Sequence, residues 1–207
     1  MRIDPDPGES EFDLIRPGYR RPRRRLAPTT PIQLAVSGAS TGPTIATVRT
    51  MKSSDNLSVR RADLDDAAAV GQLLHDFNRE YDEPTPPPAE LAERIQQLLG
   101  FGDTVVLLAG AGPDGLAVLR FRPAIWSSSQ ECYLAELYVA PAERGHGLGR
   151  ALMDAAMEAA REGHADRMDL GTSETDFVAR RLYESLGFTN REGGGQGPVM
   201  YVYEREL

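Results

Sequence analysis

A glycine-rich loop between a strand-like segment and a helix-like segment constrains the fold of this chain more than any other feature. The loop runs from Arg144 to Arg150, with glycine alternating with other residues, and it follows the apolar residues 132–139. Backbone N–H groups at the start of a helix have no partner in the helix, and the helix dipole adds partial positive charge there. Glycines let a phosphate oxygen approach these amides. The loop therefore predicts a phosphate or pyrophosphate site, to which Arg144 and Arg150 can add charge-assisted hydrogen bonds.

Two other phosphate-binding motifs fit this loop less well. A dinucleotide-binding G-x-G-x-x-G pattern would need a third glycine where Arg150 stands. A P-loop needs a Gly-Lys-Ser/Thr sequence, which the chain lacks here. The glycines by themselves are equally compatible with a purely structural turn that binds no ligand.

The body of the chain, from about residue 57, predicts an α/β fold with a mixed central sheet flanked by helices. Apolar spacing predicts the helices, and β-branched or alternating runs predict the strands, in the order β-α-α-β-β-β-α-β-α-β-β. The expected strands are residues 57–61, 104–109, 116–121, 132–139, 167–171, 188–190 and 199–203. The expected helices begin after Asp63, at Pro88 or Ala89, in the glycine-rich loop, and after a capping box Ser173-x-x-Asp176. Residues 57–207 are thus expected to form one domain.

Residues 1–56 read as a disordered or non-native extension of that domain. They are rich in Pro, Thr, Ser and Gly, carry the run Arg20-Arg-Pro-Arg-Arg-Arg25, and have little apolar surface to offset the entropy of ordering. Met51 is an alternative start of the protein. A twin-arginine export signal and a nucleic-acid-binding arm are two further readings of the arginines.

Charge and composition exclude several classes of function for the body. Residues 51–207 hold fifteen Lys and Arg against twenty-six Asp and Glu, which does not suit a polyanion such as nucleic acid. No apolar stretch reaches the roughly 18 residues of a membrane-spanning helix. Cys132 is the one cysteine, which fits a reducing compartment, and we expect a cytoplasmic protein. The three histidines lack metal-ligand spacing, so no metal site is expected.

Two motifs in the correct order resemble the acyl-CoA core of the GNAT-type N-acetyltransferases. Arg144-x-x-Gly147-x-Gly149 matches that family's [Q/R]-x-x-G-x-[G/A] signature. Ala179-Arg-Arg-Leu-Tyr-Glu-Ser-Leu-Gly-Phe188, which begins 35 residues later, matches its A-x-x-L-Y-E-x-L-G-F helix. The close resemblance covers residues 134–188, and the order of elements extends it over residues 57–207. It implies a GNAT acyltransferase-like fold.

The resemblance also implies how acetyl-CoA, a co-substrate, would be bound. It would lie where the strand ending at Val139 separates from the strand ending at Gly171. The pantetheine would pair with the backbone around Tyr138, at Leu137 and Val139, and would contact Asp176. The pyrophosphate would lie on the glycine-rich loop, whose residues are Arg144, Gly145, His146, Gly147, Leu148, Gly149 and Arg150.

Acetyl transfer to an amine needs a base and an acid. An alkyl amine has a pKa near 10, so it is mostly protonated at neutral pH and a group has to accept its proton. Glu136, on the central strand just before a bulge expected near Leu137, is the candidate base. Tyr183 matches the family tyrosine placed near the thioester sulfur and is the candidate acid for the CoA thiolate. A solvent-facing Glu136 and a Tyr183 that merely packs on the sheet are the structural alternatives.

The sequence therefore predicts an acetyl-CoA-dependent N-acetyltransferase that works by direct attack in a ternary complex. The acceptor would be a small-molecule or peptide amine, with no nucleic acid or membrane partner; a homodimer stays open. The main alternative is a non-catalytic acyl-CoA-binding or sensing module, and an acyltransferase for longer acyl groups is another.

Overall fold

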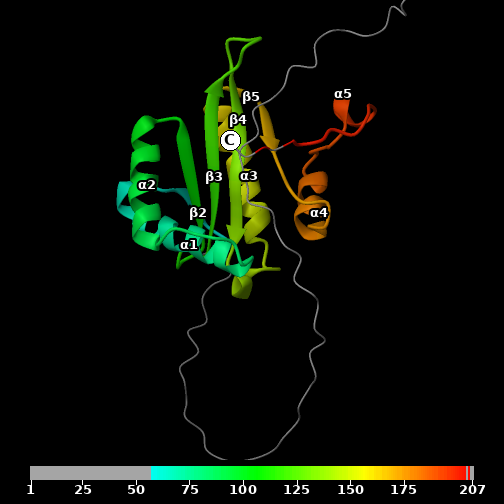
Figure 1. The fold of residues 1–207 in the computed structure, drawn as a ribbon. Coiled ribbons are helices and arrows are strands. Elements are labelled where there is room, and N and C mark those ends of the chain that lie inside the picture. Colours follow the sequence, from blue (N-terminus) through cyan, green and yellow to red (C-terminus); the bar gives the residue numbers. More distant parts are fainter. Residues whose placement is uncertain (1–56, 204, 206–207) are drawn as a thin grey trace, which may run out of the picture. The chain divides into compact units, whose positions relative to one another are not determined.

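A computed structural model describes residues 57–203 and 205, shown in Figure 1. The extension expected at residues 1–56 lies outside the described residues, and its order stays a prediction. The described residues fall into two compact units, residues 57–189 and residues 190–203 with 205. The first unit contains the sheet, the four long helices and both motifs.

The first unit follows the expected order of elements through the second motif. Its strands are β1 (Val59–Arg61), β2 (Thr104–Ala109), β3 (Gly115–Pro123), β4 (Gln130–Val139) and β5 (Ala165–Leu170). Its helices are η1 (Leu64–Asp66), α1 (Ala67–Glu80), α2 (Pro88–Phe101), η2 (Pro141–Glu143), α3 (Leu148–Glu162) and α4 (Phe177–Ser185), where η marks a short 3₁₀ helix.

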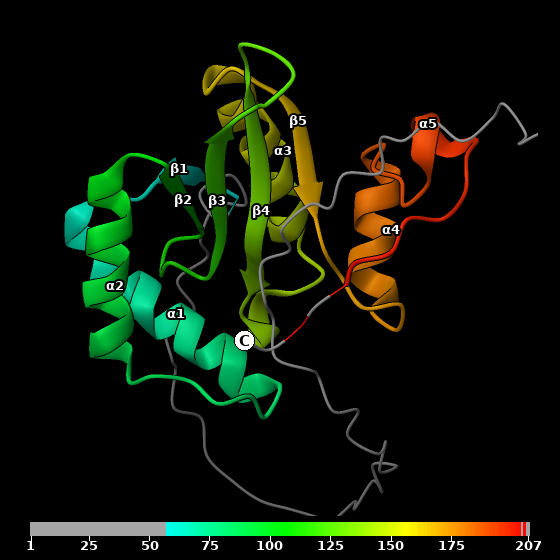
Figure 2. The same ribbon diagram turned by 45° about the horizontal axis from the view of Figure 1, so that its top comes forward.

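The sheet of the first unit is mixed, as the sequence predicted. Its strands lie in chain order, β1 to β5, with antiparallel pairs except for the parallel pair of β4 and β5. Helices α1 and α2 pack on one face and α3 packs on the other (Figure 2). The crossover through α3 is what allows β4 and β5 to run in parallel.

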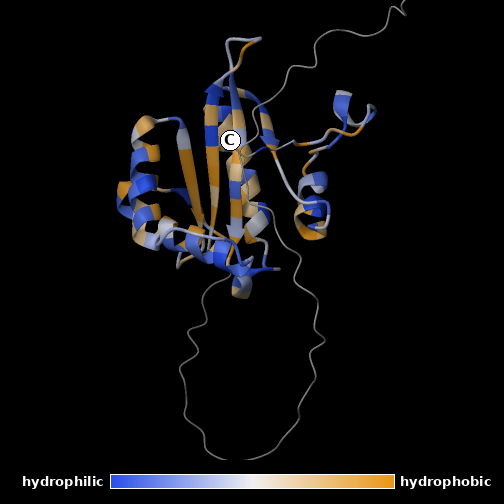
Figure 3. Ribbon diagram, in the orientation of Figure 1, coloured by the Kyte–Doolittle hydropathy of each residue, from blue (hydrophilic) through white to orange (hydrophobic). Residues whose placement is uncertain are grey.

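Two apolar clusters hold these layers together, one on each face of the sheet. In β2, Leu107 and Ala109 belong to the cluster beneath α3, the α3-side core, while Val106 and Leu108 belong to the α1/α2-side core. Burial on both faces explains why residues 104–109 read as a continuous apolar run rather than an alternating one. Figure 3 shows this hydrophobic concentration along β2 and β3.

Helix ends follow the expected capping chemistry, with one correction. Asp63 forms a capping box with Asp66 before α1, and Gly102, with φ 77°, ends α2. The expected capping box that begins at Ser173 is wrong, because the residue that caps α4 is Asp176, whose side chain accepts a hydrogen bond from the Ala179 amide at 3.1 Å. Ser173 instead lies in a tight local turn, with its hydroxyl against Thr175.

The two C-terminal strands expected at residues 188–190 and 199–203 do not form. In the second unit, the described backbone makes one isolated bridge, between Arg191 and Val199, and a short helix α5 (Glu192–Gly195). Gly193 and Gly194 have positive φ inside α5, so the glycine run bends the chain locally instead of extending it. An apolar and aromatic run such as residues 199–203 forms a strand only where another strand supplies its hydrogen-bond partners.

Candidate active site

The strands β4 and β5 pair along only part of β4 and then separate, as the sequence led us to expect. Their parallel pairing runs from Gln130 and Ala165 to Leu134 and Leu170. Beyond that pair, β4 continues through residues 135–139 against β3 alone, while β5 diverges (Figure 2). On that side the Val139 carbonyl accepts a hydrogen bond from Arg144 Nε at 2.9 Å. A strand edge that no other strand covers can also pair with a ligand that forms amide hydrogen bonds.

A bulge in β4 sets the direction of Glu136. Leu119 pairs with Leu134 and Val118 pairs with Glu136, so Ala135 is the extra residue of the strand. The bulge expected near Leu137 therefore occurs at Ala135, and Glu136 follows it rather than preceding it. Because Val118 belongs to the α1/α2-side core and paired residues point to the same face, the Glu136 side chain lies on the face of α1 and α2.

The glycine-rich loop presents the start of α3 beside the end of β4. Gly145 and Gly147 adopt left-handed backbone conformations, with φ 81° and 94°, and Gly147 is the N-cap residue with no side-chain capping bond. The first backbone hydrogen bond of the helix runs from the Ala151 amide to the Gly147 carbonyl at 3.0 Å. Within the described part of the chain, the amides of residues 148–150 donate to no acceptor. Amides of this kind are the donors from which the sequence predicted an anion site, and that role stays a prediction.

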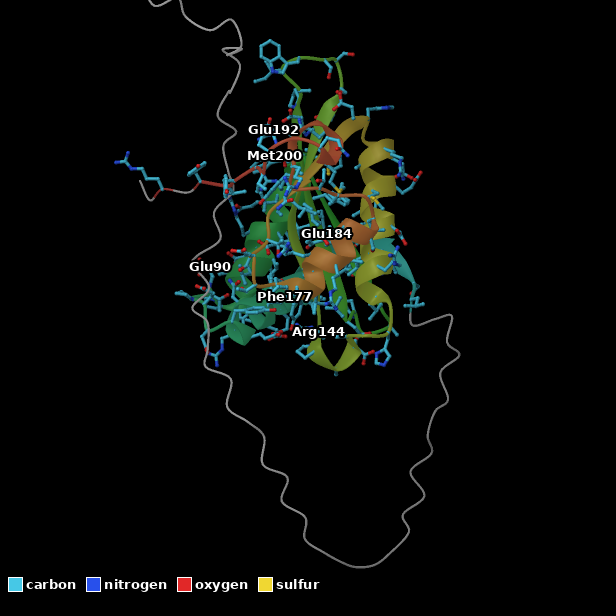
Figure 4. The ribbon with its side chains drawn as sticks, turned by 90° about the vertical axis from the view of Figure 1, so that its right-hand side faces the viewer. Glu90, Arg144, Phe177, Glu184, Glu192 and Met200 are labelled. Carbon is cyan, nitrogen blue, oxygen red and sulfur yellow. The ribbon has the colours of Figure 1, made fainter. Side chains whose placement is uncertain are left out.

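Arg144, which is labelled in Figure 4, directs its guanidinium to Glu80 and to the end of β4. Its Nη1 and Nη2 donate to the two carboxylate oxygens of Glu80, each at 2.7 Å, and its Nε donates to the Val139 carbonyl at 2.9 Å. The guanidinium also lies 5.8 Å from the ring centroid of Tyr138. The hydrogen bonds to Glu80 raise the pKa of Arg144 above its ordinary value. Glu80, at the end of α1, is a residue that the motifs did not reveal.

The second arginine of the loop contacts helix α4. Arg150 Nη2 donates to the Ser185 hydroxyl at 2.7 Å, and that hydroxyl donates to the Leu182 carbonyl at 2.7 Å. A Cβ atom on Gly149 would lie 3.6 Å from Leu182 Cδ2 and 4.0 Å from Val139 Cγ2. The start of α3, the end of β4 and one side of α4 are therefore neighbours at this end of the opening.

Tyr183 is buried in the α3-side core, whereas Glu136 lies on the α1/α2 face. The Tyr183 side chain is 8% exposed, and its ring meets that of Phe188 edge to face at a centroid distance of 6.1 Å. The acid and base candidates thus lie on opposite faces of the sheet. Asp176, expected to contact the pantetheine, uses its carboxylate as the cap of α4.

Tyr138 joins the site to α1. Its side chain is buried, stacks on Phe77 with a centroid distance of 5.1 Å, and has its pKa raised first by burial and then by the charge of Glu80. The sequence predicted only a backbone role here. The alternation of β4 could have indicated that Tyr138 and Glu136 share a face, but no local pattern pointed to the contact with Phe77.

Other features of the described residues lie outside this site. Cys132 is buried and burial raises its pKa to about 12, so the thiol gives no nucleophile at neutral pH. No group of three or more His, Cys, Asp or Glu residues able to hold a metal ion occurs among residues 57–203 and 205. None of the helices in that part of the chain is long and apolar enough to cross a membrane.

Comparison with known proteins agrees with the two motifs. The model of the acetyltransferase (GNAT) family matches residues 69–188. A solved structure of a putative acetyltransferase from Arthrobacter sp. FB24 is 49% identical and superposes with a TM-score of 0.67, covering 72% of this chain and 96% of that one. An aminoglycoside acetyltransferase from a soil metagenome, with 17% identity and a TM-score of 0.61, shares the fold.

Curated relatives carry acetyltransferase names but differ in length. A mycothiol acetyltransferase from Thermobispora bispora is 39% identical over 121 residues, which are 56% of this chain and 35% of that protein. The uncharacterized N-acetyltransferase YjgM of Escherichia coli is 32% identical over 139 residues, 63% of this chain and 80% of that protein. The chain thus spans about a third of the mycothiol acetyltransferase that it matches. The family model nevertheless matches more than half of the chain, including β2 to β5, the glycine-rich loop and α4, so the chain belongs to the acetyltransferase (GNAT) family.

Proposed function

We propose that the protein is an N-acetyltransferase that moves an acetyl group from acetyl-CoA to a primary amine by direct attack in a ternary complex. The observation that carries the proposal is the opening of β4 from β5 directly beside the uncapped amides of α3. An unpaired strand edge suits the amides of pantetheine, and helix-start amides suit a pyrophosphate. The ligand that these two features share is a coenzyme A thioester.

The cofactor contacts follow from that placement. The backbone of Leu137, Tyr138 and Val139 supplies the strand edge, and the amides of residues 145–150 supply the pyrophosphate site. Coenzyme A provides an activated thioester carbonyl, which makes the acetyl group transferable. Arg150 lies close enough to the start of α3 to contribute charge, whereas Arg144 is engaged by Glu80. Asp176 contributes mainly by fixing the start of α4.

In the reaction, Glu136 accepts a proton from the ammonium form of the acceptor, directly or through a water molecule. The neutral amine nitrogen then forms a bond to the thioester carbonyl carbon, and the carbon–sulfur bond breaks as the intermediate collapses. The nitrogen loses its second proton to solvent as the amide forms, and Tyr183 gives its hydroxyl proton to the departing thiolate and recovers one from solvent. The support for this role is the place of Tyr183, buried in the α3-side core on the face of the sheet opposite Glu136.

The acceptor is an amine whose identity needs a screen. A panel of polyamines, aminoglycosides, free lysine and peptides with a free N-terminus, read by CoA release, covers the chemical classes that the proposal allows. A cytoplasmic location and a homodimer stay predictions from the sequence.

Glu136→Gln tests the proposal. It keeps the shape and hydrogen-bonding capacity of the side chain but removes the base, so kcat should fall by roughly 10²- to 10⁴-fold with little change in acetyl-CoA affinity. Glu131→Gln is the matched control, because Glu131 lies on the same strand and pairs with Arg122 at 2.6 Å. Full activity of Glu136→Gln across a pH series would remove Glu136 from the mechanism. Tight acetyl-CoA binding by the wild type without turnover on any amine would favour the sensing module.

A further inference from the structure

The contact between Glu80 and Arg144 joins two segments that are 64 residues apart in the sequence. Glu80 is the last residue of α1, and Arg144 is the first residue of the glycine-rich loop. The guanidinium uses both terminal nitrogens on the carboxylate and its Nε on the Val139 carbonyl. Three hydrogen bonds therefore fix one side chain between a helix end, a strand end and the loop.

This geometry differs from that of an ordinary surface ion pair. An exposed pair contributes little to stability, because solvent screens it and two long side chains lose freedom. Here the carboxylate side chain is only 25% exposed, the pairing is bidentate, and the guanidinium also lies against the Tyr138 ring. Bidentate pairing with low exposure is the arrangement in which an arginine gives directional constraint as well as charge.

The pair has a consequence for the loop that follows it. Directly after Arg144 come Gly145, His146 and Gly147, and both glycines have positive φ, a conformation without local hydrogen bonds that would hold it in place. A glycine-rich segment of this kind loses much conformational entropy on ordering. Anchoring its first residue at three points reduces the entropy still to be lost when a ligand binds.

We propose that Glu80 is a positioning residue of the cofactor site, which acts through Arg144 to hold the glycine-rich loop in its ligand-binding conformation. The inference rests on the proposed function, since it assigns that loop to the pyrophosphate of acetyl-CoA. In this arrangement Arg144 holds the loop in place, and Glu80 neutralises its charge. The phosphate contacts are then made by the backbone amides and Arg150. It also ties the loop to α1 through Phe77 and Tyr138, which stack on each other.

In the alternative arrangement, Arg144 leaves Glu80 and binds phosphate directly. The two arrangements predict opposite changes in the acetyl-CoA affinity of Glu80→Gln. If Glu80 positions Arg144, Glu80→Gln loosens the loop and weakens acetyl-CoA binding by roughly tenfold, as a loss of preorganisation does. If Arg144 is a phosphate ligand that Glu80 holds back, the same substitution frees it, removes a negative charge near the phosphates, and tightens binding.

The experiment is calorimetric titration of acetyl-CoA into wild type, Glu80→Gln, Arg144→Gln and the double variant, with kcat measured at saturating acetyl-CoA. Positioning predicts that the two single variants lose similar affinity, that the double variant loses no more than either, and that kcat changes by less than about twofold. Additive losses, or tighter binding by Glu80→Gln, would overturn the inference.

A matched control separates positioning from general destabilisation. Glu162→Gln removes a carboxylate from an exposed pair with Arg61, also at 2.7 Å, that joins α3 to β1. Because this pair is exposed, its loss should lower the melting temperature no more than Glu80→Gln does, while acetyl-CoA affinity stays at the wild-type value. Equal affinity losses in Glu162→Gln and Glu80→Gln would contradict a positioning role. Absence of acetyl-CoA binding by the wild type would instead refute the proposed function itself.

Discussion

Two neighbouring glycines of the loop should respond in opposite ways to the same added methyl group. Gly147 has φ 94° and ψ −5°, and a Cβ atom there would meet nothing closer than Leu57 Cδ2 at 3.6 Å. The cost of Gly147→Ala is thus conformational rather than steric, about 1–3 kcal/mol for a non-glycine residue held in such a region. Gly149 lies inside α3, where alanine is favoured over glycine by about 1 kcal/mol, and its Cβ would make ordinary contacts with Leu182 and Val139.

The conformational cost at Gly147 should appear mainly in ligand binding. Without ligand, the loop of the variant can relax to an ordinary backbone conformation at residue 147. When the ligand binds, residue 147 has to return to the left-handed conformation, and the free-energy cost of that conformation weakens binding. Acetyl-CoA affinity of Gly147→Ala should therefore fall roughly 5- to 150-fold, since about 1.4 kcal/mol corresponds to a factor of ten.

Calorimetry with acetyl-CoA and thermal melting measure the two effects separately. Gly149→Ala should bind within about threefold of the wild type and melt at the same or a higher temperature. Equal affinity of Gly147→Ala and wild type would refute the assignment of this loop. A loss in Gly149→Ala as large as that in Gly147→Ala would show that the methyl group acts sterically, by filling the space between β4 and α4.

Three further outcomes follow from the geometry. Tyr183→Phe removes only a hydroxyl from a buried ring, so CoA release at saturation should fall roughly 10²-fold with acetyl-CoA affinity retained; an unchanged kcat would leave Tyr183 a packing residue. In Gly71→Ala, the new Cβ would lie 2.5 Å from the Pro88 carbonyl oxygen, so α1 and α2 have to separate, and urea unfolding should show a loss of about 1–3 kcal/mol. The hydrogen bonds from Arg60 lower the pKa of Asp66 to about 2, so its contribution to stability is present above the unfolded pKa near 4 and disappears as pH falls through 2. Asp66→Asn should accordingly lower the melting temperature at pH 7, with a difference from wild type that shrinks as the pH approaches 2; a constant difference would contradict this assignment.

The parts of the fold that the sequence predicted are those set by local chemistry. The helix α3 follows from glycine before an amphipathic stretch, and α2 follows from Pro88 at its start and Gly102 at its end. The hairpin of β2 and β3 follows from apolar runs around Asp114 and Gly115. In each case, the residues that specify the element are neighbours in the chain, so a pattern of spacing is sufficient to find it.

The parts that sequence reasoning missed depend on contacts between distant residues. Nothing around Glu80 indicates that its partner is Arg144, and the motif at Arg144 suggested a phosphate instead. The bulge at Ala135 results from the register between β3 and β4, which no local pattern specifies. The apolar and aromatic run at residues 199–203 favours a strand, but such a run does not specify which strand would pair with it.

The position of Cys132 argues for direct attack rather than a covalent acetyl-enzyme. A transfer in two steps needs a nucleophile that can receive the acetyl group and then meet the acceptor, and a thiolate is the strongest candidate among side chains. Cys132, the one cysteine of the chain, is 1% exposed in the α3-side core, and its raised pKa keeps it protonated. Glu136 is on the other face of the sheet, where α1 and α2 pack. Under the proposed reaction, an amine deprotonated by Glu136 would therefore not meet an acetyl group held on Cys132, whereas a thioester lying where β5 leaves β4 would be accessible from the Glu136 side.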